Sequence, residues 1–325
     1  MAYQVNAFLK ITRPITTNKN ALISLVIPIY NEALLIDTLY TRTMQAMLSI
    51  TDDFEIICVD DGSTDDSLAQ MKHYHATDKR FKVVELSRNF GHQAAYTAGL
   101  SVAKGAYIAM MDGDLQDPPE LLPAMHTQLL DNEIDIVYGK RKKRGEALQK
   151  ALSIRLFHKL FKNLSGIDAA DNVGNFSMMN RKALTAFLAL EERNRYLPGL
   201  RFFIGFKLGY VAYDRDDRTL GEAKMTFSKL VRLALDALFA FSDLPIKLSL
   251  YTGVFGILVF LGASIYTLFC KFMGIALFGW SSLSLSIYFL GSVQLLFLGI
   301  IGEYVYRIYR ETQRRPIYIM RNYFE

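Results

Sequence analysis

Two carboxylates separated by a single glycine are the residues of this sequence best placed to do chemistry. Asp112-Gly113-Asp114 follows an apolar run, Tyr107 to Met111, that predicts a buried strand. Pro118 and Pro119 prevent that strand from continuing, so the carboxylates should stand at its open C-terminal end. Hard oxygen ligands in this arrangement suit Mg²⁺ or Mn²⁺, which commonly bind one or two carboxylates plus substrate phosphates. An ordinary turn, where Asp and Gly are frequent, is the alternative interpretation.

Polar clusters also follow three other predicted strands. The strands over 24–30, 54–59 and 81–86 run into PIYNE (28–32), DDGSTDD (60–66) and SRNFGH (87–92). Strand and helix patterns alternate at short spacing, and a further strand is predicted at 134–139, which indicates a mostly parallel α/β sheet covered on both faces. Ligands of such sheets bind beyond the carboxyl ends of the strands. The sequence contains neither G-x-G-x-x-G after the first strand nor G-x-x-x-x-G-K-[ST], so phosphates should be held by metal and side chains.

The composition of the chain changes along its length. Of 325 residues 51% are hydrophobic and the pI is about 9.0, but the mixed, charged character ends near Arg218. Two runs, about 248–270 and 283–302, carry no charge and are long enough to be transmembrane helices; a buried core helix is the alternative. Basic residues flank the pair on both outer sides, which predicts that both ends are cytoplasmic. Cys58 and Cys270 give no disulfide framework.

The expected domain organisation has five parts. They are an N-terminal arm (1–20), a catalytic α/β domain (21–225), an amphipathic interfacial helix (226–246), a pair of transmembrane helices (247–303) and a basic cytoplasmic tail (304–325).

Three basic segments allow two interpretations each. The run 140–144, KRKKR, fits a solvated loop or attraction to anionic headgroups or a phosphorylated substrate, whereas nucleic acid is disfavoured. The basic amphipathic stretch 146–164 fits a helix on a membrane surface or one packed on the sheet. Arg215, Arg218 and Lys224 lie among turn residues and fit a salt-bridged surface loop or a clamp for an anion.

Five stretches resemble a known family. VIPIYNE, VDDGSTDDS, LSRNFGHQAAYTAGL, MDGDLQDPPE and IGEYVYRIYRETQRRPIYI are similar to the membrane-anchored GT-A glycosyltransferases of family 2. Within that family the chain resembles the GtrB-type polyprenyl-phosphate (bactoprenol) glucosyltransferases, relatives of dolichol-phosphate mannose synthase. The resemblance implies a GT-A (Rossmann-like) sheet domain, interfacial helices and a transmembrane hairpin in the inner (plasma) membrane. It also implies a homo-oligomer such as a tetramer.

The resemblance assigns roles to residues after the strands. It implies nucleotide-sugar contacts for Pro28, Tyr30, Asn31, Glu32, Asp60, Asp61, Gly62, Ser63, Arg88, Asn89 and Asp112. It implies Asp112 and Asp114 as ligands of Mg²⁺ or Mn²⁺, with Gln116 nearby. The acceptor phosphate would meet Arg201, Arg215, Arg218 and Lys224, the last three acting with the Asp pair in catalysis.

The implied reaction is inverting transfer of a hexose to undecaprenyl phosphate at the cytoplasmic membrane face, with UDP-glucose the favoured donor. Other donors (GDP-mannose, UDP-galactose or a UDP-amino sugar) are alternatives, as are a non-catalytic nucleotide-sugar-binding membrane protein and a processive polysaccharide synthase. The chain departs from the family pattern at Asn175, His92 and Met225, where Asp, Lys and Tyr are usual. Loss of a base at Asn175 is tolerable, because a lipid phosphate is already anionic at neutral pH.

Overall fold

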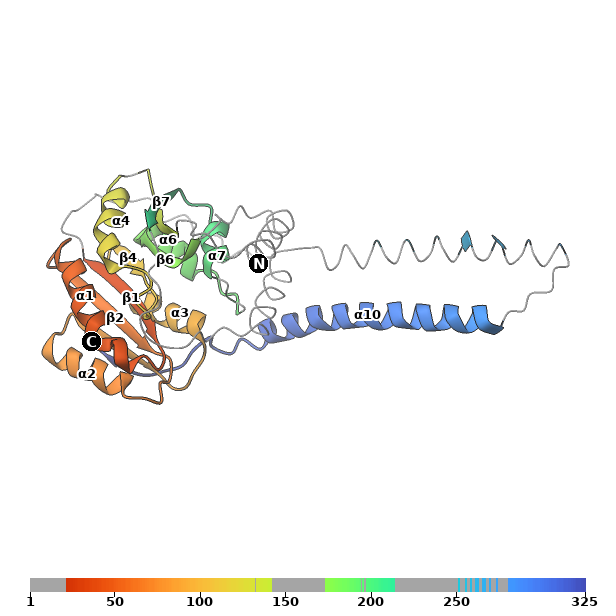
Figure 1. Cartoon of the computed structure of the whole chain (residues 1–325), viewed down its shortest axis with the longest axis horizontal. Helices are drawn as coiled ribbons and strands as arrows, with labels where there is room; N and C mark the ends of the chain where they lie inside the picture. The colour runs from red at the N-terminus through yellow and green to blue at the C-terminus, as the bar shows by residue number, and fades with distance from the viewer. Residues whose placement is uncertain are drawn as a thin grey trace, which may run out of the picture. The chain divides into compact units, whose positions relative to one another are not determined.

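The computed structural model describes residues 22–131, 133–141, 173–193, 195, 197–213 and 280–325, with single residues between 251 and 273. In this part of the chain eight strands form one sheet in the order β7-β5-β6-β4-β1-β2-β3-β8 (Figure 1). They are β1 (Ile23–Ile29), β2 (Phe54–Asp60), β3 (Phe81–Leu86), β4 (Tyr107–Met110), β5 (Ile136–Arg141), β6 (Val173–Asn180), β7 (Leu208–Tyr213) and β8 (Met320–Phe324).

The central strands confirm the predicted α/β architecture. β1 pairs in parallel with both β2 and β4, and β2 pairs in parallel with β3. Every residue of β1 and β2 is buried, as expected for strands covered on both faces. Their carboxyl ends therefore meet at one edge of the sheet, where the polar clusters begin.

Helices cover both faces of this sheet. They are α1 (Ile36–Leu48), α2 (Ser67–Thr77), α3 (His92–Val102), α4 (Leu122–Leu129), α6 (Arg181–Leu188) and α7 (Leu197–Phe203), with 3-10 turns η2 (Ala33–Leu35) and η3 (Pro119–Leu121). The apolar stripes of α1 and α4 share one core with Leu25 and Ile27. On the opposite face α3 approaches so closely that a Cβ on Gly99 would lie 2.8 Å from Val59 and would also meet Val26. Figure 1 shows α1 and α3 on opposite sides of β1 and β2.

The sheet is mostly parallel, as expected, but two of its strands, β6 and β8, run in the opposite direction. β6 runs antiparallel to β4 and β5, and β8 runs antiparallel to β3, while β5 and β7 are parallel. The expectation rested on the regular strand–helix alternation of the first half of the chain. No comparable alternation exists around β6 and β8, so their direction had no local signal.

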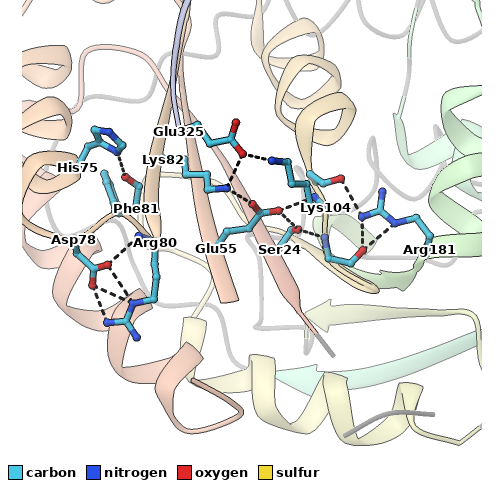
Figure 2. A network of polar contacts seen from close by, with 12 residues as sticks. Ser24, Glu55, His75, Asp78, Arg80, Phe81, Lys82, Lys104, Arg181 and Glu325 are labelled. Atoms are coloured by element: carbon cyan, nitrogen blue, oxygen red, sulfur yellow. Dashed lines mark hydrogen bonds and ion pairs between the residues drawn. The ribbon is translucent and has the colours of Figure 1, made fainter. Parts of the chain in front are cut away.

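The last residues of the chain join the sheet, although 304–325 was expected to be a tail. β8 pairs with the outer edge of β3, and Arg321 and Asn322 contact the Glu85 carboxylate at 3.3 and 3.0 Å. Figure 2 shows a second polar network in the sheet domain, centred on buried Glu55, in which the carboxylate of Glu325 also takes part through Lys82. Pairing with β8 covers the edge of β3, so that β3 cannot pair with a strand of another chain.

The chain divides into two compact units, one holding the sheet with Pro316–Glu325 and the other holding α10 (Trp280–Thr312). Among the residues that the structure describes, no helix is both long and apolar enough to cross a membrane. The expected span 283–302 falls within α10. The arm 1–20, the helix 226–246 and most of 248–270 lie outside the described residues.

Candidate active site

Hydrogen bonds between loops join the carboxyl ends of β1, β2 and β3. The backbone N–H of Asn31 donates to Ser63 Oγ at 3.1 Å, and its own side-chain oxygen accepts from the Thr64 N–H at 2.8 Å. The Asp61 carboxylate accepts from the N–H groups of Phe90 and Gly91 at 2.7 and 3.0 Å. The expected gathering of these clusters at one sheet edge is confirmed.

Two glycines allow the loops to approach this closely. Gly62 has φ +72°, and a Cβ there would lie 2.6 Å from the backbone nitrogen of Asn89. Gly113 separates the two carboxylates, and a Cβ there would lie 2.6 Å from Ile29 Cδ1 and 3.0 Å from Pro28 O. Any other residue type at these positions would push apart the loops that form the site.

Asp112 is held by two side chains of α3. Its Oδ1 accepts a hydrogen bond of 2.6 Å from the Tyr96 hydroxyl and lies 3.1 Å from His92 Nε2. Burial alone would raise the pKa of Asp112, but the hydrogen bond and charge of His92 and the hydrogen bond of Tyr96 outweigh it and lower that pKa to about 2. Asp112 is therefore ionised at neutral pH.

The same contacts act on His92 in the opposite direction. The His92 side chain is 45% exposed, and its partial desolvation works to lower its pKa, but the hydrogen bond to Asp112 and the negative charges of Asp112, Asp61 and Asp114 raise that pKa above its usual value. His92, a departure from the family pattern, thus lies in direct contact with the first carboxylate of the pair.

The Asp112–Asp114 pair fits a divalent cation whose coordination is completed by the substrate. Asp114 Oδ1 accepts from the Gln116 N–H at 3.2 Å, which folds the turn, and Leu115 between them has an uncommon φ of +55°. Within the described residues no group of three or more His, Cys, Asp or Glu side chains could enclose a metal ion. Two hard carboxylates suit Mg²⁺ or Mn²⁺, because these ions commonly complete their coordination with water and substrate phosphates.

The residues expected to contact the nucleotide sugar differ in exposure. Tyr30, Arg88 and Asn89 are exposed, and Asn31, Glu32, Gly62 and Ser63 are half-buried. Pro28, Asp60 and Asp61 are buried, with Asp60 and Asp61 only 1% and 3% exposed. Asp60 accepts from the Ser63 N–H at 3.2 Å, and burial raises the pKa of both carboxyls. In this structure Asp61 joins the loops after β2 and β3, and Asp60 braces its own loop, which are roles that the resemblance did not imply.

Arg201, which was expected to contact the acceptor phosphate, lies inside the sheet domain. Its side chain is fully buried, and its guanidinium donates to the carbonyls of Asn175 and Gly174 at 2.9 and 2.8 Å and to Ser177 Oγ. In this structure Arg201 therefore has a structural role under β6, and its contact with the acceptor phosphate stays a prediction. The reason is that α7 turns its basic residue inward, against Tyr138, whose ring centre lies 5.1 Å from the guanidinium carbon.

Sequence reasoning missed a polar group next to the Asp pair. Asp117 is fully buried and accepts from the Tyr213 hydroxyl and from Arg141, whose nitrogen lies 3.4 Å away. The positive charge of Arg141 also helps to lower the pKa of Asp112. Arg141 is the second residue of the basic run 140–144, so phosphate attraction was among its expected roles, but nothing local indicated its pairing with Asp117.

Several expected site residues lie outside the described residues. They are Arg215, Arg218, Lys224, Met225 and the stretch 146–164. Asn175 is described: its backbone carbonyl accepts from Arg201, and its buried Oδ1 has no hydrogen-bond partner among the described residues.

Comparisons with known proteins agree with this geometry. Residues 24–188 match the family described as Glycosyl transferase family 2. An uncharacterized glycosyltransferase of Synechocystis sp. is 38% identical, covering 92% of this chain and 94% of its own. A bactoprenol glucosyl transferase of Shigella phage SfV is 33% identical, covering 92% and 98%.

A solved structure shares the fold. Glucosyl-3-phosphoglycerate synthase from Mycobacterium tuberculosis, in complex with Mn²⁺, UDP and glucosyl-3-phosphoglycerate, superposes with a TM-score of 0.50 at 18% identity. The match covers 70% of this chain and 81% of that chain.

Proposed function

The chain belongs to glycosyl transferase family 2 and is a glycosyltransferase, and on this basis we propose that it transfers a hexose from a nucleoside diphosphate to a polyprenyl phosphate. The favoured reaction uses UDP-glucose and undecaprenyl phosphate. The observation that carries the proposal is the Asp112-Gly113-Asp114 turn at the sheet edge where the ends of β1 to β4 meet. Near full-length similarity to proteins named bactoprenol glucosyl transferase supports the lipid acceptor.

Asp112 and Asp114 would hold Mg²⁺ or Mn²⁺ against the donor diphosphate, where the cation supplies Lewis-acid stabilisation of the leaving group. The chain contributes a low pKa at Asp112, which keeps that ligand ionised across the physiological pH range. The exposed residues Tyr30, Arg88 and Asn89 border the same edge and would bind the nucleotide. Preformed loops reduce the entropic cost of bringing two reactants together.

The acceptor needs orientation more than activation. The second pKa of a phosphate monoester is about 6, so the lipid phosphate is a ready nucleophile at neutral pH. A chain with Asn175 in place of a carboxylate can therefore run the reaction by one in-line displacement, which inverts the anomeric configuration. Arg215, Arg218 and Lys224 remain the proposed contacts of the two phosphates, because Arg and Lys offset their mutual repulsion.

The proposed location is the cytoplasmic face of the inner membrane, with both termini cytoplasmic. This rests on the two uncharged runs, 248–270 and 283–302, and on the basic residues outside them. A membrane anchor would bring the catalytic domain to a lipid acceptor that does not leave the bilayer. A homo-oligomer such as a tetramer is the proposed assembly.

The experiment uses the full chain purified in detergent with undecaprenyl phosphate and Mg²⁺ or Mn²⁺. UDP-glucose, UDP-galactose, UDP-N-acetylglucosamine and GDP-mannose are offered separately, and the glycolipid is identified by mass and by its anomeric configuration. The proposal predicts a metal-dependent, inverted product, formed best from UDP-glucose. A product from a different donor changes the sugar, a retained configuration excludes single displacement, and no product from any donor contradicts the proposed acceptor and donor class.

A further inference from the structure

One oxygen of Asp112 is in polar contact with two side chains of one helix. His92 and Tyr96 are four residues apart on α3, so their side chains lie on the same face of that helix. Their rings meet edge to face, with centroids 4.9 Å apart, and both contact Oδ1 of Asp112, at 3.1 and 2.6 Å. A carboxylate offers about four lone-pair positions over its two oxygens. The two contacts therefore use the acceptor capacity of Oδ1, and within the described residues Oδ2 accepts no hydrogen bond.

The helix that carries these two side chains is firmly placed. Tyr96 is fully buried, and Gly99, one turn further along, lets α3 lie directly on β1 and β2. At the start of the helix the Gly91 N–H donates to Asp61. The position of the Tyr96 hydroxyl is thus set by the same sheet that carries Asp112, and the pair can move little relative to each other.

We propose that Tyr96 and His92 are positioning residues that bind Oδ1 of Asp112 and leave Oδ2 as the oxygen offered to the divalent cation. The inference rests on the proposed function, because it assumes that Asp112 is a metal ligand. Neighbours that orient a ligating carboxylate commonly change metal affinity by 10- to 100-fold when they are removed. Tyr96 is well suited to this task, since its ring is locked by packing and its hydroxyl is a neutral donor that leaves the carboxylate charge intact.

The test measures Mn²⁺ binding to the full chain in detergent by electron paramagnetic resonance, with and without UDP. Tyr96→Phe keeps the ring and removes only the hydroxyl, and we expect it to weaken Mn²⁺ binding about tenfold. The control is Tyr74→Phe, which also removes a tyrosine–aspartate hydrogen bond, the 2.8 Å bond to Asp37, but at the far end of α2. The control should bind Mn²⁺ as the unaltered chain does.

A second pair of variants tests the histidine. His92→Leu removes the donor and should weaken Mn²⁺ binding, whereas His92→Gln keeps an N–H donor and should restore most of the affinity. Since His92 is exposed, neither change should unfold the domain. If His92 had only a structural role, both variants would lower the melting temperature and their Mn²⁺ affinities would be the same.

The outcomes distinguish the inference from the function beneath it. If Tyr96→Phe and His92→Leu bind Mn²⁺ as tightly as the unaltered chain does, the positioning role is overturned and the proposed function stays intact. An unaltered chain that binds no Mn²⁺, even with UDP, overturns the metal site and the inference with it.

Discussion

The guanidinium of Arg201 donates a hydrogen bond of 2.9 Å to the backbone carbonyl of Asn175, the residue that stands where the family usually has an aspartate. A second bond, to the Gly174 carbonyl at 2.8 Å, fixes the start of β6. A cation that the sequence suggested for substrate thus supports the strand that borders the site. Its charge is satisfied by backbone oxygens rather than by a ligand.

Replacing Arg201 should therefore cost stability. Arg201→Met leaves two half-buried carbonyls without their donor, at roughly 1–3 kcal/mol each, so the free energy of unfolding should fall by about 3 kcal/mol. Arg42→Met is the control, because the Arg42–Glu120 pair lies at the surface and such pairs contribute about 0–1 kcal/mol. Thermal unfolding in detergent checks both. A normal melting temperature with a raised KM for the lipid phosphate would return Arg201 to the acceptor site.

Gly62 should tolerate no side chain. Gly62→Ala places a Cβ 2.6 Å from Asn89 N in a left-handed conformation, so strain and a backbone clash add together. Gly205→Ala isolates the strain alone, because Gly205 has φ +68° but no atom within 4 Å of the added carbon. We expect the free energy of unfolding, measured by thermal unfolding, to fall by about 1 kcal/mol for Gly205→Ala and by clearly more for Gly62→Ala.

Nucleotide affinity separates the two glycine variants further. Because Gly62 joins the β2 and β3 loops, Gly62→Ala should weaken UDP binding, measured by calorimetry, while Gly205→Ala leaves it unchanged. Equal UDP affinity in both variants would mean that the contact between these loops does not shape the nucleotide site.

The Glu55 network predicts a stability that depends on pH. Burial opposes ionisation of Glu55, but hydrogen bonds from Lys82 at 2.8 Å, Ser24 at 2.6 Å and the Lys104 N–H at 2.6 Å lower its pKa (Figure 2). A carboxyl whose pKa is lower in the folded state stabilises the fold above its unfolded pKa, about 4.3, and loses this contribution as the pH falls through the folded pKa.

Glu55→Gln should reveal that contribution. The variant leaves Lys82 without its buried partner, and breaking a buried ion pair costs about 3–5 kcal/mol. We expect a clearly lower melting temperature at pH 7 and a difference from the unaltered chain that shrinks below pH 4. A difference that stays constant from pH 7 to pH 3 would show that the charge of Glu55 is not responsible.

The central part of the fold could be predicted because its signals are local. The apolar runs that form β1 to β4 each end in a polar cluster. In a parallel sheet the carboxyl ends of the strands lie at one edge, so these clusters meet there. Asp112 and Asp114 were recognisable for the same reason, since their spacing and the preceding strand lie in one short stretch.

What could not be predicted depends on contacts between distant residues. β8 pairs with β3 more than 230 residues away in the chain, as the Arg321–Glu85 contact shows, and no pattern within 320–324 announces it. The inward turn of Arg201, the pairing of Arg141 with Asp117 and the contact of Tyr96 with Asp112 are likewise set by packing. A residue type indicates what chemistry is available, but only the fold decides which partner uses it.

The most direct test of the account is the transfer activity of Asp114→Asn. Asparagine keeps the oxygen that accepts from the Gln116 N–H and removes the charge that a cation needs. Asp131→Asn is a matched control, because exposed Asp131 accepts from the Glu133 N–H at 3.3 Å with the same two-residue spacing. With the donor that the screen identifies, the account predicts that Asp114→Asn transfers sugar roughly 10²–10³-fold more slowly while Asp131→Asn is unchanged. Transfer by Asp114→Asn at the unaltered rate would contradict the assignment of this pair as the catalytic metal site.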